Sequence, residues 1–126
     1  MRVYISGTMT GVPDLNRPAF DAAAKSLRDK GHFVINPHDL TPIFGTAEEV
    51  AQSFDCLYYS EEDSHYSPHS SVIRLSRAVM DAELAAVRSC DAIYLLKGWE
   101  ESRGAKKELA EALTHGLTVM QEGAEV

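Results

Sequence analysis

The chain has 126 residues, of which 44% are hydrophobic and 25% charged, so its size and composition are those of one folded domain and exclude a disordered or fibrous protein. The formal net charge of −7 disfavours duplex nucleic acid and anionic membrane surfaces as partners. Two cysteines are too few for a disulfide framework, and neither a membrane-length apolar run nor a signal peptide is recognisable, so we expect a cytoplasmic protein.

The start of the chain has the pattern of a βαβ unit. A β-branched and aromatic run over residues 2–6 predicts a strand. Helical spacing follows between Asn16, a candidate N-cap, and Gly31, a candidate stop. The apolar face of this helix comprises Phe20, Ala23, Ala24 and Leu27. A second strand is predicted over residues 32–36 and ends at Pro37, so the two strands should be parallel with a right-handed crossover.

Residues 38–71 form the least regular part of the chain, with a helical possibility at residues 47–54. An excursion of that length inside a small domain is more often a lid or a binding segment than filler. It contains Cys56 and the pair His65 and His69, but this spacing lacks a fourth zinc ligand. We therefore expect neither a metal nor another cofactor.

A second helix, a buried strand, a third helix and a last strand follow. The second helix has an apolar face of Ile73, Met80, Leu84 and Val87. The apolar run at residues 91–96 is typical of a buried parallel strand, and Cys90 before it is predicted to be a core residue. The third helix is expected to start at Ser102 as N-cap and to end at Gly116, before a strand at residues 117–121. Its expected core residues are Ala105, Leu109, Ala112 and Leu113.

This alternation predicts a single α/β domain over residues 1–126, a three-layer flavodoxin-like sandwich with four or five parallel strands. Its ligand should lie where the first and third strands end, at the loops after Ser6 and Leu96. Small residues in these loops could hold a phosphate or a sugar through backbone amides. The candidate binding residues there are Ser6, Gly7, Thr8, Gly98, Trp99, Ser102 and Gly104. Ordinary turn chemistry explains the same residues, and Trp99 could either stack on a base or cover the edge of the sheet.

Two glutamates flank the apolar faces of the second and third helices. Glu108 lies about 40° around its helix from Gly104, so its carboxylate could project towards the loop across the space that the glycine leaves. Glu83 flanks the preceding helix in the same way. Two carboxyl groups on adjacent helices are the minimum equipment for cleaving a glycosidic bond. The competing interpretation is that both are ordinary surface glutamates among 19 acidic residues.

Three stretches of the chain resemble the nucleoside 2-deoxyribosyltransferase-like superfamily, especially its short uncharacterised members from phages and bacteria. They are residues 3–11, 16–20 and 90–108. The likeness covers about three quarters of the chain, all but the middle excursion. Its most specific element is the spacing Ser102-x-Gly104-x3-Glu108.

The resemblance implies cleavage of the N-glycosidic bond of a 2′-deoxynucleoside 5′-monophosphate, or transfer of its deoxyribosyl group. Glu108 would be the nucleophile of a covalent glycosyl-enzyme intermediate, and Tyr4 would orient it by a hydrogen bond. Ser102 and Gly104 would bind the 5′ end of the substrate, which favours the monophosphate hydrolase. The opposing wall would be Ser6, Gly7 and Thr8.

The superfamily usually has an aspartate, a proton donor or sugar ligand, at the position that Glu83 occupies here, with Asp81 two residues earlier. The resemblance also implies a homodimer or larger assembly. A different hypothesis is a non-catalytic module that sequesters a nucleotide or a nucleotide-derived signal, and a third is an interaction domain with a vestigial site. The sequence selects neither the base nor the acceptor.

Overall fold

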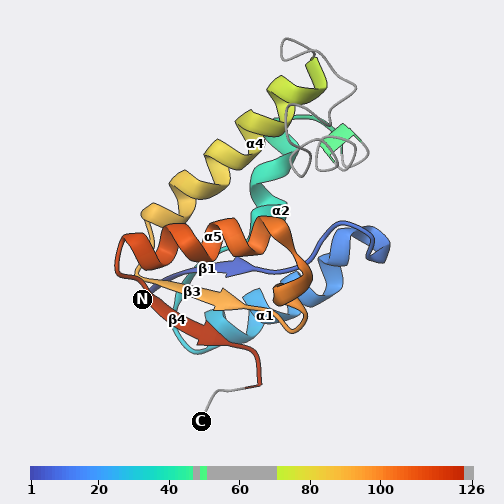
Figure 1. Cartoon of the computed structure of the whole chain (residues 1–126). Helices are drawn as coiled ribbons and strands as arrows, with labels where there is room; N and C mark the ends of the chain where they lie inside the picture. Colours follow the sequence, from blue (N-terminus) through green and yellow to red (C-terminus); the bar gives the residue numbers. More distant parts are fainter. Residues whose placement is uncertain (47–48, 51–70, 124–126) are drawn as a thin grey trace.

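The computed structural model describes residues 1–46, 49–50 and 71–123. In chain order the elements are β1 (Arg2–Ser6), η1 (Pro13–Asn16), α1 (Arg17–Asp29), β2 (Phe33–Ile35), α2 (Pro37–Leu40), η2 (Thr41–Ile43), α4 (Ser71–Arg88), β3 (Ala92–Leu95), η3 (Trp99–Glu101), α5 (Arg103–Thr114) and β4 (Thr118–Gln121). The strands form one parallel sheet in the order β2-β1-β3-β4 (Figure 1). The predicted α/β class and flavodoxin-like order are therefore confirmed.

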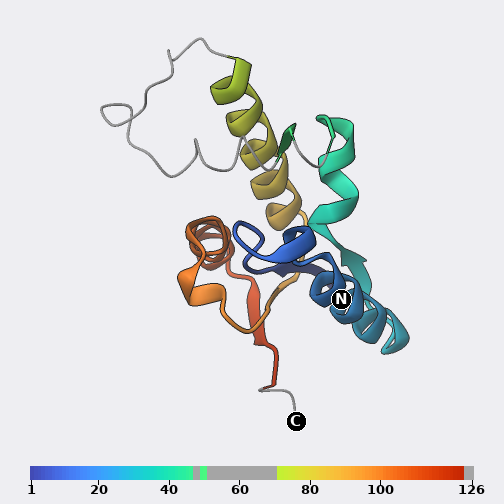
Figure 2. The ribbon, with the colours of Figure 1, turned by 90° about the vertical axis from the view of Figure 1, so that its right-hand side faces the viewer.

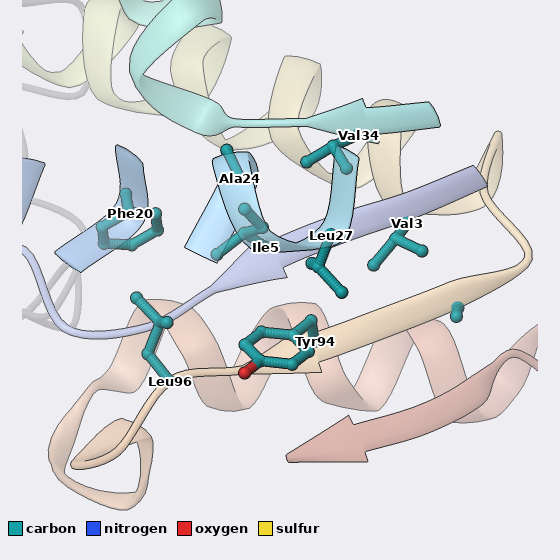
Figure 3. Packing of buried hydrophobic residues seen from close by; sticks show 9 residues of the cluster. Val3, Ile5, Phe20, Ala24, Leu27, Val34, Tyr94 and Leu96 are labelled. Carbon is teal, nitrogen blue, oxygen red and sulfur yellow. The ribbon is translucent and has the colours of Figure 1, made fainter. Parts of the chain in front are cut away.

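The sheet is the middle one of three layers. Helix α1 packs on one face, and α4 and α5 pack on the other (Figures 1 and 2). Figure 3 shows the core beneath α1, where Phe20, Ala24 and Leu27 meet Val3 and Ile5 from β1. Each large side chain buried there contributes about 1.5–3 kcal/mol to stability.

Strand β1 presents two different faces because successive side chains of a strand point to opposite sides. Val3 and Ile5 face α1, whereas Tyr4 belongs to the apolar cluster beneath α4 and α5 and Ser6 shares its side of the strand. That second cluster consists of Tyr4, Val87, Cys90, Ile93, Leu95 and Ala112. The side of β1 that faces α4 and α5 therefore carries two hydroxyl groups, those of Tyr4 and Ser6, next to an otherwise apolar cluster.

The turn before α1 differs from the prediction. Asn16 precedes the helix but adopts a left-handed conformation, and its side chain makes no capping bond; its amide donates instead to the Thr8 carbonyl at 3.0 Å. Asp14 and Leu15 also have positive φ. The ring of His38 holds this turn from the other side, with Nε2 at 3.0 Å from the Leu15 carbonyl. Asn16 therefore lies at the N-cap position as predicted, but its side chain does not cap the helix and instead links the turn to the loop after β1.

The buried faces of the helices also differ from the prediction. Leu113, expected in the core, is 61% exposed, whereas α5 buries Ala105, Glu108 and Ala112. On α4, Ile73 and Leu84 are only half-buried. The residues of α4 that are buried are Ser76, Val79, Met80, Glu83 and Val87. Each helix is thus rotated so that a glutamate enters the interior.

The region after β2 is more regular at its start than predicted. Pro37 ends the strand and opens α2, where the Asn36 side chain accepts a hydrogen bond from the His38 backbone at 3.0 Å. The first half of α4 extends past the sheet beside α2 (Figures 1 and 2). A small apolar cluster around Val50 and Val79 also includes Phe44, which follows η2.

The remaining predictions for this region, namely the helix at 47–54 apart from residues 49–50, together with Cys56, His65 and His69, lie outside the described residues. Across residues 1–46, 49–50 and 71–123, no grouping of side chains could hold a metal ion. A helix long and apolar enough to cross a bilayer is likewise absent from those ranges.

Candidate active site

Four polar side chains meet between the sheet and the two helices that cover it. Tyr4 and Ser6 come from β1, Glu83 from α4 and Glu108 from α5. Tyr4 and Ser6 are fully buried, and the two glutamates are only 6% and 5% exposed. Charged groups are rarely buried to this extent unless they are paired, so this cluster is the most unusual feature of the described core.

The carboxylate of Glu108 is held by both hydroxyl groups of β1. The Tyr4 hydroxyl donates to Oε2, and the Ser6 hydroxyl donates to Oε1 at 2.8 Å. Residues two apart on a strand point the same way and are separated by about 6.6 Å, a spacing that lets them bind the two oxygens of one carboxylate. The sheet therefore fixes the position and the orientation of this group.

Glu83 approaches the same carboxylate from the neighbouring helix. It lies one helical turn before Val87, as Glu108 lies one turn before Ala112, and those two apolar residues pack together in the cluster beneath the helices. The Glu83 and Glu108 carboxyl groups are hydrogen-bonded to each other. Oε1 of Glu83 is buried and has no hydrogen-bond partner among the described residues.

Burial dominates the electrostatics of the cluster. It raises the pKa of Glu108 to about 7, against the lowering effect of the hydrogen bonds from Tyr4, Ser6 and Glu83. Burial, and next the charge of Glu108, raise the pKa of Glu83 well above the ordinary value. The pKa of Tyr4 is also raised well above its ordinary value, first by burial and then by Glu108, so its hydroxyl remains a donor.

The two predicted loops are joined beside this cluster. The Thr8 side chain donates to the Gly98 carbonyl at 2.9 Å, which ties the end of β1 to the end of β3. Ser102 caps α5 as predicted, because its hydroxyl accepts from the Ala105 backbone at 3.1 Å. A Cβ atom on Gly7 would lie 2.9 Å from Cβ of Leu96, so the close packing of the two strand ends requires a glycine there.

Two other predicted site residues, Asp81 and Trp99, have different surroundings in the structure. Asp81 is exposed and stands about 200° around α4 from Glu83, so the structure does not bring it to the cluster. Trp99 packs against the apolar cluster beneath α5, which fits the covering role, and its buried Nε1 has no partner among the described residues. Cys90 is buried, and burial raises the pKa of its thiol, as expected of a core residue.

A groove of about 290 Å³ lies elsewhere, between α1 and the turn from β2 to α2. Its lining includes Asp21, Arg28 and Asn36 but none of the four clustered side chains. The groove and the carboxyl cluster are therefore separate features.

The comparison with protein families assigns the chain to a family. One family model matches residues 1–56 and 61–121. The chain belongs to the DUF4406 family. That family is described as a domain of unknown function, and the search found no significant match to a curated protein or a solved structure. Membership in DUF4406 therefore carries no activity with it, and the likeness to the deoxyribosyltransferase-like superfamily remains a prediction.

In this DUF4406 protein the structure brings Tyr4, Glu83 and Glu108 together, as the resemblance implied. Ser6, expected as part of the wall of the binding site, is instead a hydrogen-bond donor to the carboxylate. The sequence does contain a signal for this contact: Ser6 follows Tyr4 by two residues, so in a strand both side chains point to the same side. The direct contact between Glu83 and Glu108 had no sequence signal, because it depends on how two helices pack.

Proposed function

We propose that this protein hydrolyses the N-glycosidic bond of a 2′-deoxynucleoside 5′-monophosphate, with transfer of the deoxyribosyl group to another base as the related reaction. The observation that supports this most strongly is the carboxylate of Glu108, buried and gripped by Tyr4 and Ser6 at the carboxyl end of β1. Ligands of open α/β sheets bind at that edge. The sequence resemblance points to the same residue as the nucleophile.

The environment of Glu108 suits a nucleophile. A pKa of about 7 leaves about half of the groups ionised at neutral pH, and poor solvation makes the ionised form more reactive than a carboxylate in water. The two hydroxyl donors stabilise the charge of the ionised form. An anion in this position also stabilises the positive charge that develops on a sugar ring as its base departs.

The proposed reaction has two displacements. An oxygen of Glu108 forms a bond to C1′, the C1′–N bond breaks, and the base leaves with the bonding electron pair and takes up a proton from water. A water molecule then attacks C1′ from the opposite side, releases Glu108 as a carboxylate and gives its proton to solvent. Two inversions at C1′ leave the configuration retained.

The start of α5 supports a phosphorylated substrate. The first backbone N–H groups of a helix have no partner within the helix, and the helix dipole favours an anion there. Ser102 and Gly104 lie at this end, next to the loop that Thr8 ties to Gly98. A 5′-phosphate bound at this end of α5 would place the sugar towards Glu108, less than two turns along the same helix.

The test is a panel of nucleosides and 5′-monophosphates, incubated with the protein and assayed by chromatography for free base. We expect release from one or more deoxynucleoside monophosphates, and loss of release in Glu108→Gln with nucleotide affinity kept within a few-fold. Glu111→Gln, a glutamate on the same helix paired with Arg88 and His115, is the control and should retain activity. Tight nucleotide binding without any release would instead support a sequestering module.

A further inference from the structure

The structure also indicates which role Glu83 has beside Glu108. This role rests on the proposed function. Two carboxyl groups in direct contact and shielded from water cannot both be ionised at neutral pH, because their repulsion is not screened. Among the described residues no cation is found to compensate this repulsion: on this side of the sheet β3 contributes Ile93 and Leu95, and Cys90 acts on Tyr4. The titratable groups that face Glu108 are Tyr4 from β1 and Glu83 from α4. The pair therefore holds at least one proton at neutral pH, and one proton once Glu108 is ionised.

Hydrogen bonding decides which carboxyl carries that proton. Glu108 receives the Tyr4 and Ser6 hydroxyls, so its charged form is stabilised. Glu83 has a buried oxygen with no donor at all among the described residues, an arrangement that strongly disfavours its charged form. Glu83 is thus the neutral acid of the pair, and its proton is directed at Glu108.

This geometry does not suit an acid that protonates the leaving base. In retaining glycosidases the two carboxyl groups stand about 5–5.5 Å apart and flank the bond that is cleaved. Here the two carboxyl groups are instead hydrogen-bonded to each other, so Glu83 is directed at the nucleophile. We propose that Glu83 is a positioning residue that supplies the third hydrogen bond to the ionised Glu108, and that it does not protonate the departing base.

Two substitutions separate these roles. Glu83→Gln keeps a hydrogen-bond donor but has no transferable proton, whereas Glu83→Leu keeps the approximate size and loses the donor. We expect base release at pH 7.5 to fall by no more than about tenfold in Glu83→Gln and by about 10- to 100-fold in Glu83→Leu, the value of a hydrogen bond to a charged group. A loss of 100- to 10,000-fold in both variants is expected of a general acid and would overturn the proposal.

A titration tests the pair without relying on activity. Carbon-13 labelling of glutamate carboxyl groups, with signals assigned from Glu83→Gln and Glu108→Gln, should show two coupled steps in the wild type: the Glu108 step near pH 7, and a Glu83 step raised well above the ordinary pKa of a glutamate. In Glu83→Gln the Glu83 step should disappear while the Glu108 step remains near pH 7. In Glu83→Leu the Glu108 step should move up by about one to two pH units, because the donor is lost.

The two measurements distinguish the failure of each proposal. If the wild type releases no base from any substrate but shows the coupled titration, the proposed reaction is wrong and the proton-sharing pair stands. If base is released but Glu83→Gln leaves the Glu108 titration and its coupling unchanged, Glu83 does not act on the nucleophile. The pH profile adds a third readout, since Glu83→Gln should lose the decline of activity at high pH that a doubly ionised pair produces in the wild type.

Discussion

Replacing Glu108 by glutamine should make the protein more stable, and increasingly so as the pH rises. In the folded protein burial raises the pKa of Glu108 above its ordinary value, so between these two values the folded state binds more protons than the unfolded state. The stability that this group contributes is therefore fully present below its unfolded pKa and is lost as the pH rises through its folded pKa. Glutamine has a similar shape and cannot ionise, so the variant avoids this loss.

The pKa values set the magnitude. A folded value of about 7 and an ordinary value of 4.5, at about 1.4 kcal/mol per pH unit, correspond to about 3 kcal/mol of destabilisation by ionised Glu108. Near pH 5 the variant and the wild type should unfold within about 1 kcal/mol of each other, since the buried group is protonated in the fold. At pH 8.5 the variant should be more stable by about 3 kcal/mol, a large fraction of the 5–15 kcal/mol that stabilises a typical domain.

Urea unfolding at half-unit steps from pH 5 to pH 9 measures this difference. The difference between variant and wild type is the informative quantity, because the titrating groups other than Glu83, which is coupled to Glu108, contribute nearly equally to both and cancel. Glu111→Gln is the matched control: its hydrogen bond from Arg88 lowers the pKa of Glu111, so losing that carboxylate should not stabilise the protein at high pH. A difference for Glu108→Gln that stays constant across the range would refute the buried, ionisable state of Glu108.

Three further substitutions test neighbouring parts of the structure. Tyr4→Phe removes a donor to the carboxylate, so the pKa of Glu108 should rise by about one to two units and base release at pH 7 should fall about 10- to 100-fold, with recovery near pH 9 in a pH–rate profile. Gly7→Ala forces a contact with Leu96 and should lower the urea-unfolding free energy by about 1–3 kcal/mol; an unchanged midpoint would contradict the close approach. Asp14→Gly relieves a left-handed backbone at an exposed residue, and thermal unfolding should show stabilisation by about 0.5–1 kcal/mol, not a loss.

The order of the sheet could be predicted because it follows from local patterns. Strand-like runs alternate with helical ones, and a right-handed crossover from residues 2–6 to residues 33–35 leaves few arrangements. The edge that carries the site follows in turn, since the loops after Ser6 and Leu96 end adjacent strands. These inferences needed only the period of the sequence and the handedness of the chain.

The rotation of the helices could not be predicted in the same way. An apolar pattern places leucines inside and glutamates outside, so Leu113 was expected in the core and Glu108 at its flank. The structure reverses them, because Glu108 finds its partners on β1 and α4, far away in sequence. The left-handed turn at Asn16 escaped prediction for the same reason: it is held by the Thr8 carbonyl and, at Leu15, by His38. A local sequence pattern cannot predict a contact between residues that come together only in the folded chain.

These departures from the pattern carry information about function. Two neighbouring carboxyl groups buried between a sheet and two helices lower the stability of the fold, whereas leucine or methionine would fill similar space at no electrostatic cost. The hydroxyls of Tyr4 and Ser6 offset part of that cost at Glu108, but Oε1 of Glu83 receives nothing from the described residues. An arrangement that served only to fix the packing would be expected to satisfy both groups. One oxygen of Glu83 thus lacks a hydrogen-bond donor among the described residues, whereas both oxygens of the neighbouring Glu108 have one. This difference is better explained by chemistry at Glu108 than by structure alone.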